Sequence, residues 1–60
     1  MIKITFKDGE VANWSTNEYQ YETTSMGQWI RIYPKFQHIQ YPQYYYPIYE
    51  IAELYIDQDS

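Results

Sequence analysis

The side chains that could take part in catalysis are few in this sequence, and they lie apart. His38 is the single histidine, and its neighbours Gln37, Ile39 and Gln40 supply neither an acid to orient it nor a second metal ligand. Enzymatic catalysis needs at least a nucleophile with a base, a metal cluster, or carboxylates held in a pocket. We therefore interpret His38 as an exposed or edge-strand residue.

Two acidic residues near the C-terminal end have the only other spacing of catalytic interest. Glu50 and Glu53 would face each other on a helix, but no histidine or aspartate falls in register with them, and such a pair is more often a solvated surface. Gly9 and Gly27 are isolated and form no phosphate-binding loop. Because the chain has no cysteine, the usual structural zinc sites are excluded. The sequence predicts a protein that is not an enzyme and uses no metal or cofactor.

Tyrosine is the dominant residue type, with nine among 60 residues. Each aromatic side chain buries about 150 to 250 Å², and a buried hydroxyl needs a hydrogen-bond partner, so a small core cannot hold them all. At a surface, tyrosine gives a rigid contact at low entropic cost. High strand propensity accounts for Tyr19 and Tyr21. We predict that a partner protein is contacted by the cluster in the uncharged segment after Gln40, which comprises Tyr41, Tyr44, Tyr45, Tyr46 and Tyr49.

The segment Gln28–Tyr33 carries bulky groups on both of its faces. Ile30 and Ile32 alternate with the residues Trp29, Arg31 and Tyr33. A second full sheet is hard to build in so short a chain, so we expect the second face to be covered by another copy of the protein. Tryptophan, tyrosine and arginine are the residue types that dominate interface energetics. The sequence thus predicts a homodimer that associates through Trp29, Arg31 and Tyr33, although the self-association and partner-binding assignments could be exchanged.

The distribution of charge disfavours nucleic acid as a ligand. The net charge is −4, and the C-terminal end is acidic, with Glu50, Glu53, Asp57 and Asp59. A phosphate backbone is an improbable ligand for such an end. The alternative function is a small β-barrel that binds single-stranded nucleic acid, because exposed aromatic rings can stack on bases. That alternative requires the four basic residues to gather on one face with Trp29 and Tyr33. The basic residues are Lys3, Lys7, Arg31 and Lys35.

Most of the first half has the two-residue period of β-strands. Alternating apolar and polar residues predict strands over Met1–Lys7, Glu10–Trp14, Glu18–Thr24 and Gln28–Tyr33. Asp8–Gly9 is typical of a two-residue type I′ hairpin turn, because this dipeptide tolerates positive φ at both central positions.

Proline shapes the second half, since each of the three prolines removes a backbone donor and is unwelcome in a central strand. We predict two short edge strands here, Phe36–Tyr41 and Gln43–Tyr46. The next segment fits both helical and strand spacing. We expect a turn of helix at Ile48–Glu50, a final strand over Ile51–Asp57, and a frayed tail over Asp57–Ser60.

These elements predict a mostly β fold in a single domain of residues 1–60. It is a small antiparallel sheet or a partly open barrel of four to six short strands, with the option of one short helix near Ile48–Glu53. The alternating pattern begins directly after Met1, where a secretory signal would have a basic stretch and an apolar run. No stretch approaches the roughly 20 apolar residues that span a bilayer. We therefore expect a cytoplasmic protein.

Two segments resemble small phage-encoded β proteins, a group in which inhibitors of bacterial defence are common. They are the opening Met1-Ile-Lys-Ile-Thr-Phe-Lys-Asp-Gly9 and the strand Trp29-Ile-Arg-Ile-Tyr33. The resemblance covers the first half of the chain. It implies a virus-encoded protein in the host cytoplasm that blocks a bacterial immune complex by binding it, as a homodimer. The acidic C-terminal end would complement a basic cleft, so a nucleic-acid-handling complex is another expected target. If the resemblance is set aside, the alternative function is that of a structural or adaptor homodimer.

Overall fold

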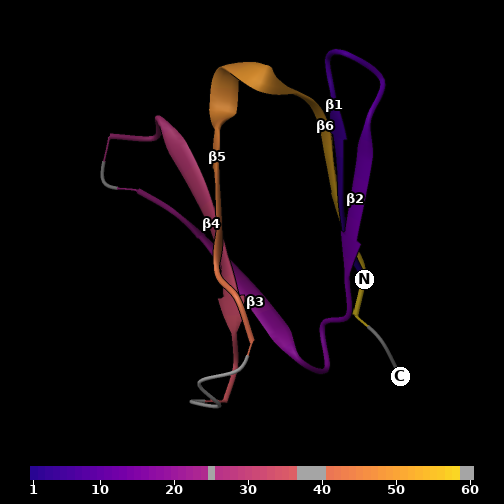
Figure 1. The fold of residues 1–60 in the computed structure, drawn as a ribbon, viewed down its shortest axis with the longest axis vertical. Helices are drawn as coiled ribbons and strands as arrows, with labels where there is room; N and C mark the ends of the chain where they lie inside the picture. Colours follow the sequence, from indigo (N-terminus) through magenta and orange to yellow (C-terminus); the bar gives the residue numbers. More distant parts are fainter. Residues whose placement is uncertain (25, 37–40, 59–60) are drawn as a thin grey trace.

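The computed structural model describes residues 1–24, 26–36 and 41–58, and these fold into two small antiparallel sheets that lie face to face (Figure 1). The first sheet has the order β2-β1-β6, with strands β1 (Ile2–Phe6), β2 (Val11–Trp14) and β6 (Ile51–Ile56). The second has the order β3-β4-β5, with strands β3 (Tyr19–Thr23), β4 (Trp29–Pro34) and β5 (Tyr44–Pro47). The predicted mostly β fold is confirmed, and over the described residues the sheets do not close into a barrel.

Four isoleucines from the two central strands form the core between the sheets. Ile2 and Ile4 of β1 and Ile30 and Ile32 of β4 are each at most 1% exposed. Each pair occupies alternate positions, because successive side chains of a strand point to opposite faces of its sheet. Half-buried side chains surround these four residues: Phe6, Trp14, Tyr19, Tyr44, Tyr46, Ile48, Ile51 and Ile56.

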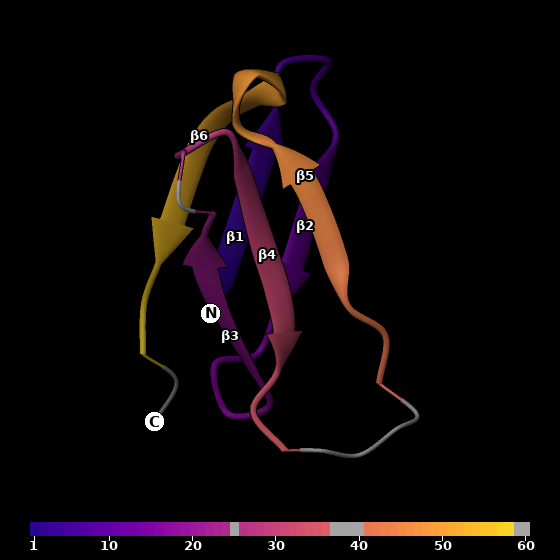
Figure 2. The ribbon, with the colours of Figure 1, turned by 90° about the vertical axis from the view of Figure 1, so that its left-hand side faces the viewer.

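The chain does build a second sheet, which we expected to be hard in so few residues. The strands are only four to six residues long, so each sheet is small enough for the other to cover most of its inner face. Figure 2 shows β5 lying over β2 and β4 over β1. Large aromatic side chains fill the rim that the four isoleucines leave open, which is how so short a chain completes a two-layer fold.

The hairpin between β1 and β2 forms as predicted, but its turn is of a different type. Gly9 has a positive φ of 94°, whereas no residue other than glycine among the described ones does, so Asp8 does not adopt the type I′ conformation. The Gly9 N–H donates to the Phe6 carbonyl at 3.0 Å, and the Phe6 N–H donates to the Glu10 carbonyl at 2.8 Å. The loop therefore has three residues with glycine in the left-handed position. The Asp8 carboxylate accepts the Glu10 N–H at 2.9 Å and holds the turn.

The second half follows the predicted order of strand, helical turn and strand. β5 is shifted by one residue and ends at Pro47, on a sheet edge where a missing donor leaves no ladder bond unmade. The helical turn is the 3-10 turn η1 (Ile48–Glu50), and β6 begins directly after it. The strand predicted over Phe36–Tyr41 lies largely outside the described residues, as does His38. No helix among the described residues is long and apolar enough to cross a membrane.

The η1 turn ties the ends of the two sheets together. The Ile48 N–H donates to the carbonyl of Gln28, in the loop that leads into β4, at 2.8 Å. The Lys7 N–H donates to the carbonyl of Glu50 at 2.9 Å, which fastens the other end of η1 to the first sheet. Both hydrogen bonds hold the middle residue of the turn, Tyr49, at the shared end of the two sheets, where the ribbon turns over at the top of Figure 1.

Candidate interaction surface

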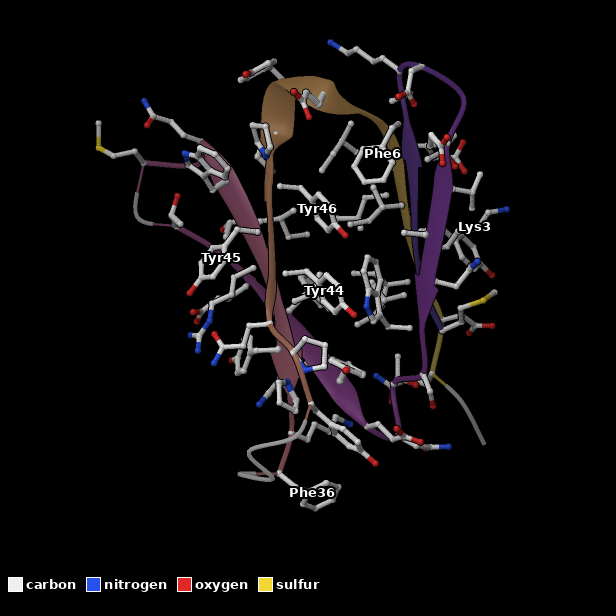
Figure 3. The ribbon with its side chains drawn as sticks, viewed as in Figure 1. Lys3, Phe6, Phe36, Tyr44, Tyr45 and Tyr46 are labelled. Atoms are coloured by element: carbon white, nitrogen blue, oxygen red, sulfur yellow. The ribbon has the colours of Figure 1, made fainter. Side chains whose placement is uncertain are left out.

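The run of three tyrosines in β5 is divided between two faces of its sheet. Tyr44 lies opposite Ile32 and Tyr46 lies opposite Ile30, so both point toward the core. Tyr45 lies opposite Arg31 and points away from it. Figure 3 shows Tyr44 and Tyr46 between the sheets and Tyr45 on the outside.

The inner tyrosines are part of the fold. The ring centroid of Tyr46 is 5.0 Å from that of Phe6 and 5.9 Å from that of Trp14, and Tyr44 lies 5.4 Å from Trp14. The rings are tilted relative to one another, as is favourable for aromatic pairs. Burial raises the pKa of the Tyr46 hydroxyl, and the nearby Tyr44 raises it further. These two side chains therefore close the core on the side where β5 covers β2.

Tyr41 also lies against an inner residue. Its ring stacks on that of Tyr19 with centroids 6.1 Å apart, although 41% of Tyr41 remains exposed. Burial is the main cause that raises the pKa of Tyr19, and the neighbouring Tyr44 and Glu18 raise it further. Tyr41 is thus a partly exposed extension of the aromatic rim.

The outward-facing residues of the second sheet form a surface that we call the outer aromatic face, composed of Trp29, Arg31, Tyr33 and Tyr45. Trp29 is 43% exposed and Tyr45 is 55% exposed. Trp29 lies opposite Pro47 across the β4–β5 ladder, just as Arg31 lies opposite Tyr45. The residues predicted for self-association and one predicted for partner binding therefore share one face.

Arg31 is fixed in position at the centre of this face. Its Nη1 donates to the Oε1 of Glu22 at 2.7 Å, and its Nε donates to the Oε1 of Gln43 at 3.2 Å. Its guanidinium carbon lies 4.1 Å from the ring centroid of Tyr33, as in cation–π contacts. The hydrogen bond that Arg31 donates to Glu22 is the main cause that raises the pKa of Arg31. The cation is therefore held in place and paired before any partner arrives.

Glu22 and Gln43 were missing from the sequence-based prediction of the site. Glu22 lies opposite Arg31 on β3, and Gln43 immediately precedes β5. The alternation in the segment Glu18–Thr24 places Glu22 on the solvated face of a strand, but its position opposite Arg31 depends on the register of the β3–β4 hairpin. The turn between the two strands sets that register, and the alternation alone does not specify it.

Tyr49 lies apart from the outer aromatic face, at the end of the molecule. It is 72% exposed and stands between two shallow depressions. One is lined by Phe6, Lys7, Asp8 and Glu50, and the other by Gly27, Gln28, Trp29 and Ile48. We call the two depressions together with Tyr49 the end groove. Because Trp29 belongs to both surfaces, the end groove continues from the outer aromatic face.

The basic residues do not gather beside the aromatic ones. Lys3 lies opposite Asn13 and Tyr55 in the first sheet and points outward from it, on the far side of the molecule from Tyr45 (Figure 3). The requirement that all four bases share a face with Trp29 and Tyr33 is therefore not met. Within the described ranges, no three histidine or acidic side chains are grouped so that they could hold a metal ion.

Comparisons with known proteins identify no relative: no protein-family model matches the chain, and neither the curated proteins nor the solved structures contain a match.

Proposed function

We propose that the protein is a non-enzymatic protein-binding module that contacts its partner through the outer aromatic face. The observation that carries this proposal is the exposure of Trp29 and Tyr45 beside an arginine that is already oriented. Tryptophan, tyrosine and arginine supply most interface hot spots, and exposed apolar patches on small proteins usually mark interaction sites.

The electrostatics of the face support a protein as the partner. Arg31 and Glu22 form an ion pair within the face, whereas the chain as a whole has a net charge of −4. A partner therefore meets aromatic surface without an unmatched charge at its centre. Since the Glu22, Gln43 and Tyr33 contacts already restrict the Arg31 side chain, binding loses little further rotamer entropy there.

The narrower proposal follows from the resemblance to phage-encoded β proteins. In that case the partner is a host defence complex or another nucleic-acid-handling complex, and the protein acts as an inhibitor in the host cytoplasm. A basic cleft in such a target would be complemented by three exposed acidic residues at the C-terminal end of the chain, Glu50, Glu53 and Asp57.

Capture of partners by tagged variants tests the proposal. We expect wild-type protein to enrich a specific protein from lysate of its source cells, and Trp29→Ala and Tyr45→Ala each to reduce that enrichment at least about tenfold. Tyr55→Ala is the matched control, because Tyr55 is also exposed but lies on the outer face of the other sheet. The proposal is wrong if the Tyr55 variant loses the partner while the other two keep it.

A homodimer is a second use of the same face, proposed from the position of Trp29, Arg31 and Tyr33. Because Tyr45 lies opposite Arg31, a dimer that covers this face must cover Tyr45 too. We therefore expect Trp29→Ala and Tyr45→Ala both to shift a dimer toward monomer in light scattering. A shift with Trp29→Ala alone would instead separate the self-association residues from the partner-binding ones.

Single-stranded nucleic acid is the weaker candidate. Stacking surfaces for bases work together with a positively charged groove, and on the outer aromatic face Arg31 is paired with Glu22. A gel shift at low salt decides between the two. We expect no retardation at about 10 μM single strand. At low salt, the electrostatic binding that is usual for nucleic-acid-binding proteins is tight enough to cause retardation at this concentration.

A further inference from the structure

The end groove has the shape and lining of a docking site for a short segment of chain. The backbone on both sides of Tyr49 is fixed by the hydrogen bonds that fasten η1 to both sheets, Ile48 N–H to the Gln28 carbonyl and Lys7 N–H to the Glu50 carbonyl. The Tyr49 ring separates a depression walled by Trp29 from one walled by Phe6. A ligand that crosses Tyr49 would therefore place side chains in both depressions.

The backbone around the groove selects the conformation of such a ligand. The backbone groups of β4 are engaged on both sides, by β3 and by β5. The edge strands beside the groove stop on either side of it, because β5 ends at Pro47 and β6 begins only at Ile51. The η1 residues between them offer little for an added strand. A polyproline II segment needs no backbone partners, because its own backbone stays solvated, and proline rings pack well on tryptophan and tyrosine. The groove therefore suits a proline-containing segment better than a strand.

The charges at one side of the groove select a basic residue in that segment. The depression beyond Tyr49 is lined by Asp8 and Glu50, against one cation, Lys7. The Asp8 carboxylate accepts the Glu10 N–H, and a carboxylate has capacity for further hydrogen bonds. A lysine or arginine next to the prolines would lie beside both carboxylates, whereas an acidic residue would be repelled.

We propose that the end groove binds an extended, proline-containing segment of the partner protein that carries a lysine or arginine beside its prolines. Tyr49 and Trp29 hold the prolines, and Asp8 and Glu50 receive the cation. This proposal rests on the proposed function as a protein-binding module and specifies which chemistry of the partner is recognised.

An amide NMR titration of the full chain tests the proposal with three synthetic peptides of equal length. The first has three Ala-Pro-Pro repeats followed by arginine, the second ends in glutamate instead, and the third has glycine and serine in place of the repeats but keeps the arginine. We expect saturable shifts at Gln28, Trp29, Tyr49 and Glu50 with the first peptide. The second should bind about three- to fivefold more weakly, and the third at least about tenfold more weakly.

Two sets of variants separate the roles of the groove residues. Tyr49→Ala should weaken the first peptide at least about tenfold, and its 72% exposure makes a loss of fold improbable, which the dispersion of the amide spectrum checks. Asp8→Asn with Glu50→Gln should remove the preference for arginine over glutamate. Tyr55→Ala, on the other sheet, should leave all affinities unchanged.

The proposal is overturned if the first peptide causes no shifts at millimolar concentration, or if the third peptide binds as well as the first. If the peptides fail while Trp29→Ala and Tyr45→Ala still abolish capture of a partner protein, the protein-binding function stands and only the ligand class is wrong. If capture also survives in those variants, both proposals are wrong.

Discussion

The two faces of the β3-β4-β5 sheet use the same residue types for different purposes. On the inner face, Tyr44 and Tyr46 pack with Trp14 and complete the core. On the outer face, Tyr45 and Trp29 are about half exposed and flank an arginine that is paired within the sheet. A one-residue shift of β5 against β4 would turn Tyr45 inward and Tyr44 and Tyr46 outward, since the side-chain period of a strand is two. Strand register, and not the abundance of tyrosine, decides which rings are available to a partner.

The largest effect on the free energy of unfolding is expected for a substitution in the core, on the inner face of the sheet. Ile32→Ala removes a fully buried side chain, and such changes destabilise by about 2–5 kcal/mol. A domain of this length has roughly 3–9 kcal/mol in total at typical values per residue. We therefore expect the variant to lose about half of its stability and to melt at a clearly lower temperature, as measured by thermal denaturation. A variant that melts near the wild-type temperature would contradict the position of Ile32 in the core.

A neighbouring pair of substitutions sharpens the comparison directly. Tyr46→Ala should lower the free energy of unfolding by about 2–3 kcal/mol, somewhat less than for a fully buried aromatic residue. Tyr45→Ala should change it by only about 0.5 kcal/mol, as is usual for surface positions. Urea denaturation of both variants measures the difference. Equal losses would mean that the two side chains are not on opposite faces.

The ionisation of Tyr46 provides a third comparison. Burial raises its pKa above the ordinary value of 10.0, so the folded state holds this proton more tightly than the unfolded state does. Its contribution to stability is complete below pH 10 and is lost as the pH rises through the raised pKa. We expect the free energy of unfolding to fall in this alkaline range and to fall less in Tyr46→Phe. An identical decline in the two proteins would show that Tyr46 is not responsible.

The smallest effect is expected for the ion pair on the outer face. Glu22 and Arg31 are partly exposed, with 49% and 30% of their side chains accessible, and such pairs contribute about 0–1 kcal/mol. Glu22→Gln should therefore leave the free energy of unfolding nearly unchanged at moderate salt. If the main role of Glu22 is to orient Arg31, the same variant should weaken partner capture more than it weakens the fold. A loss of stability above about 2 kcal/mol would instead assign the pair to the core of the structure.

The sequence predicted most strands and the helical turn, because their alternation and punctuation are local. The alternating isoleucines of β1 and β4 indicated two buried faces, and Pro47 before η1 indicated where a helical turn could begin. The three-residue turn at Gly9 was missed because an Asp-Gly pair fits several hairpin turns, and the number of loop residues depends on where the strands pair.

The division of the tyrosine cluster could not be predicted in the same way. Tyr44, Tyr45 and Tyr46 are identical side chains at consecutive positions, so hydrophobic alternation carries no information about which of them faces inward. Pairing with β4 decides it, and residues 35–43 separate the two strands, so no short turn in the sequence specifies the register. For the same reason, the position of Tyr45 opposite Arg31 and the depression that Tyr49 shares with Trp29 could be seen only in the fold.

The most direct test is to measure partner capture and stability together for the double variant Trp29→Ala with Tyr45→Ala. The outer aromatic face, as a binding surface, predicts that the free energy of unfolding changes by about 1 kcal/mol or less while capture of the partner is lost. Capture that is undiminished in the folded double variant would contradict the assignment of binding to this face.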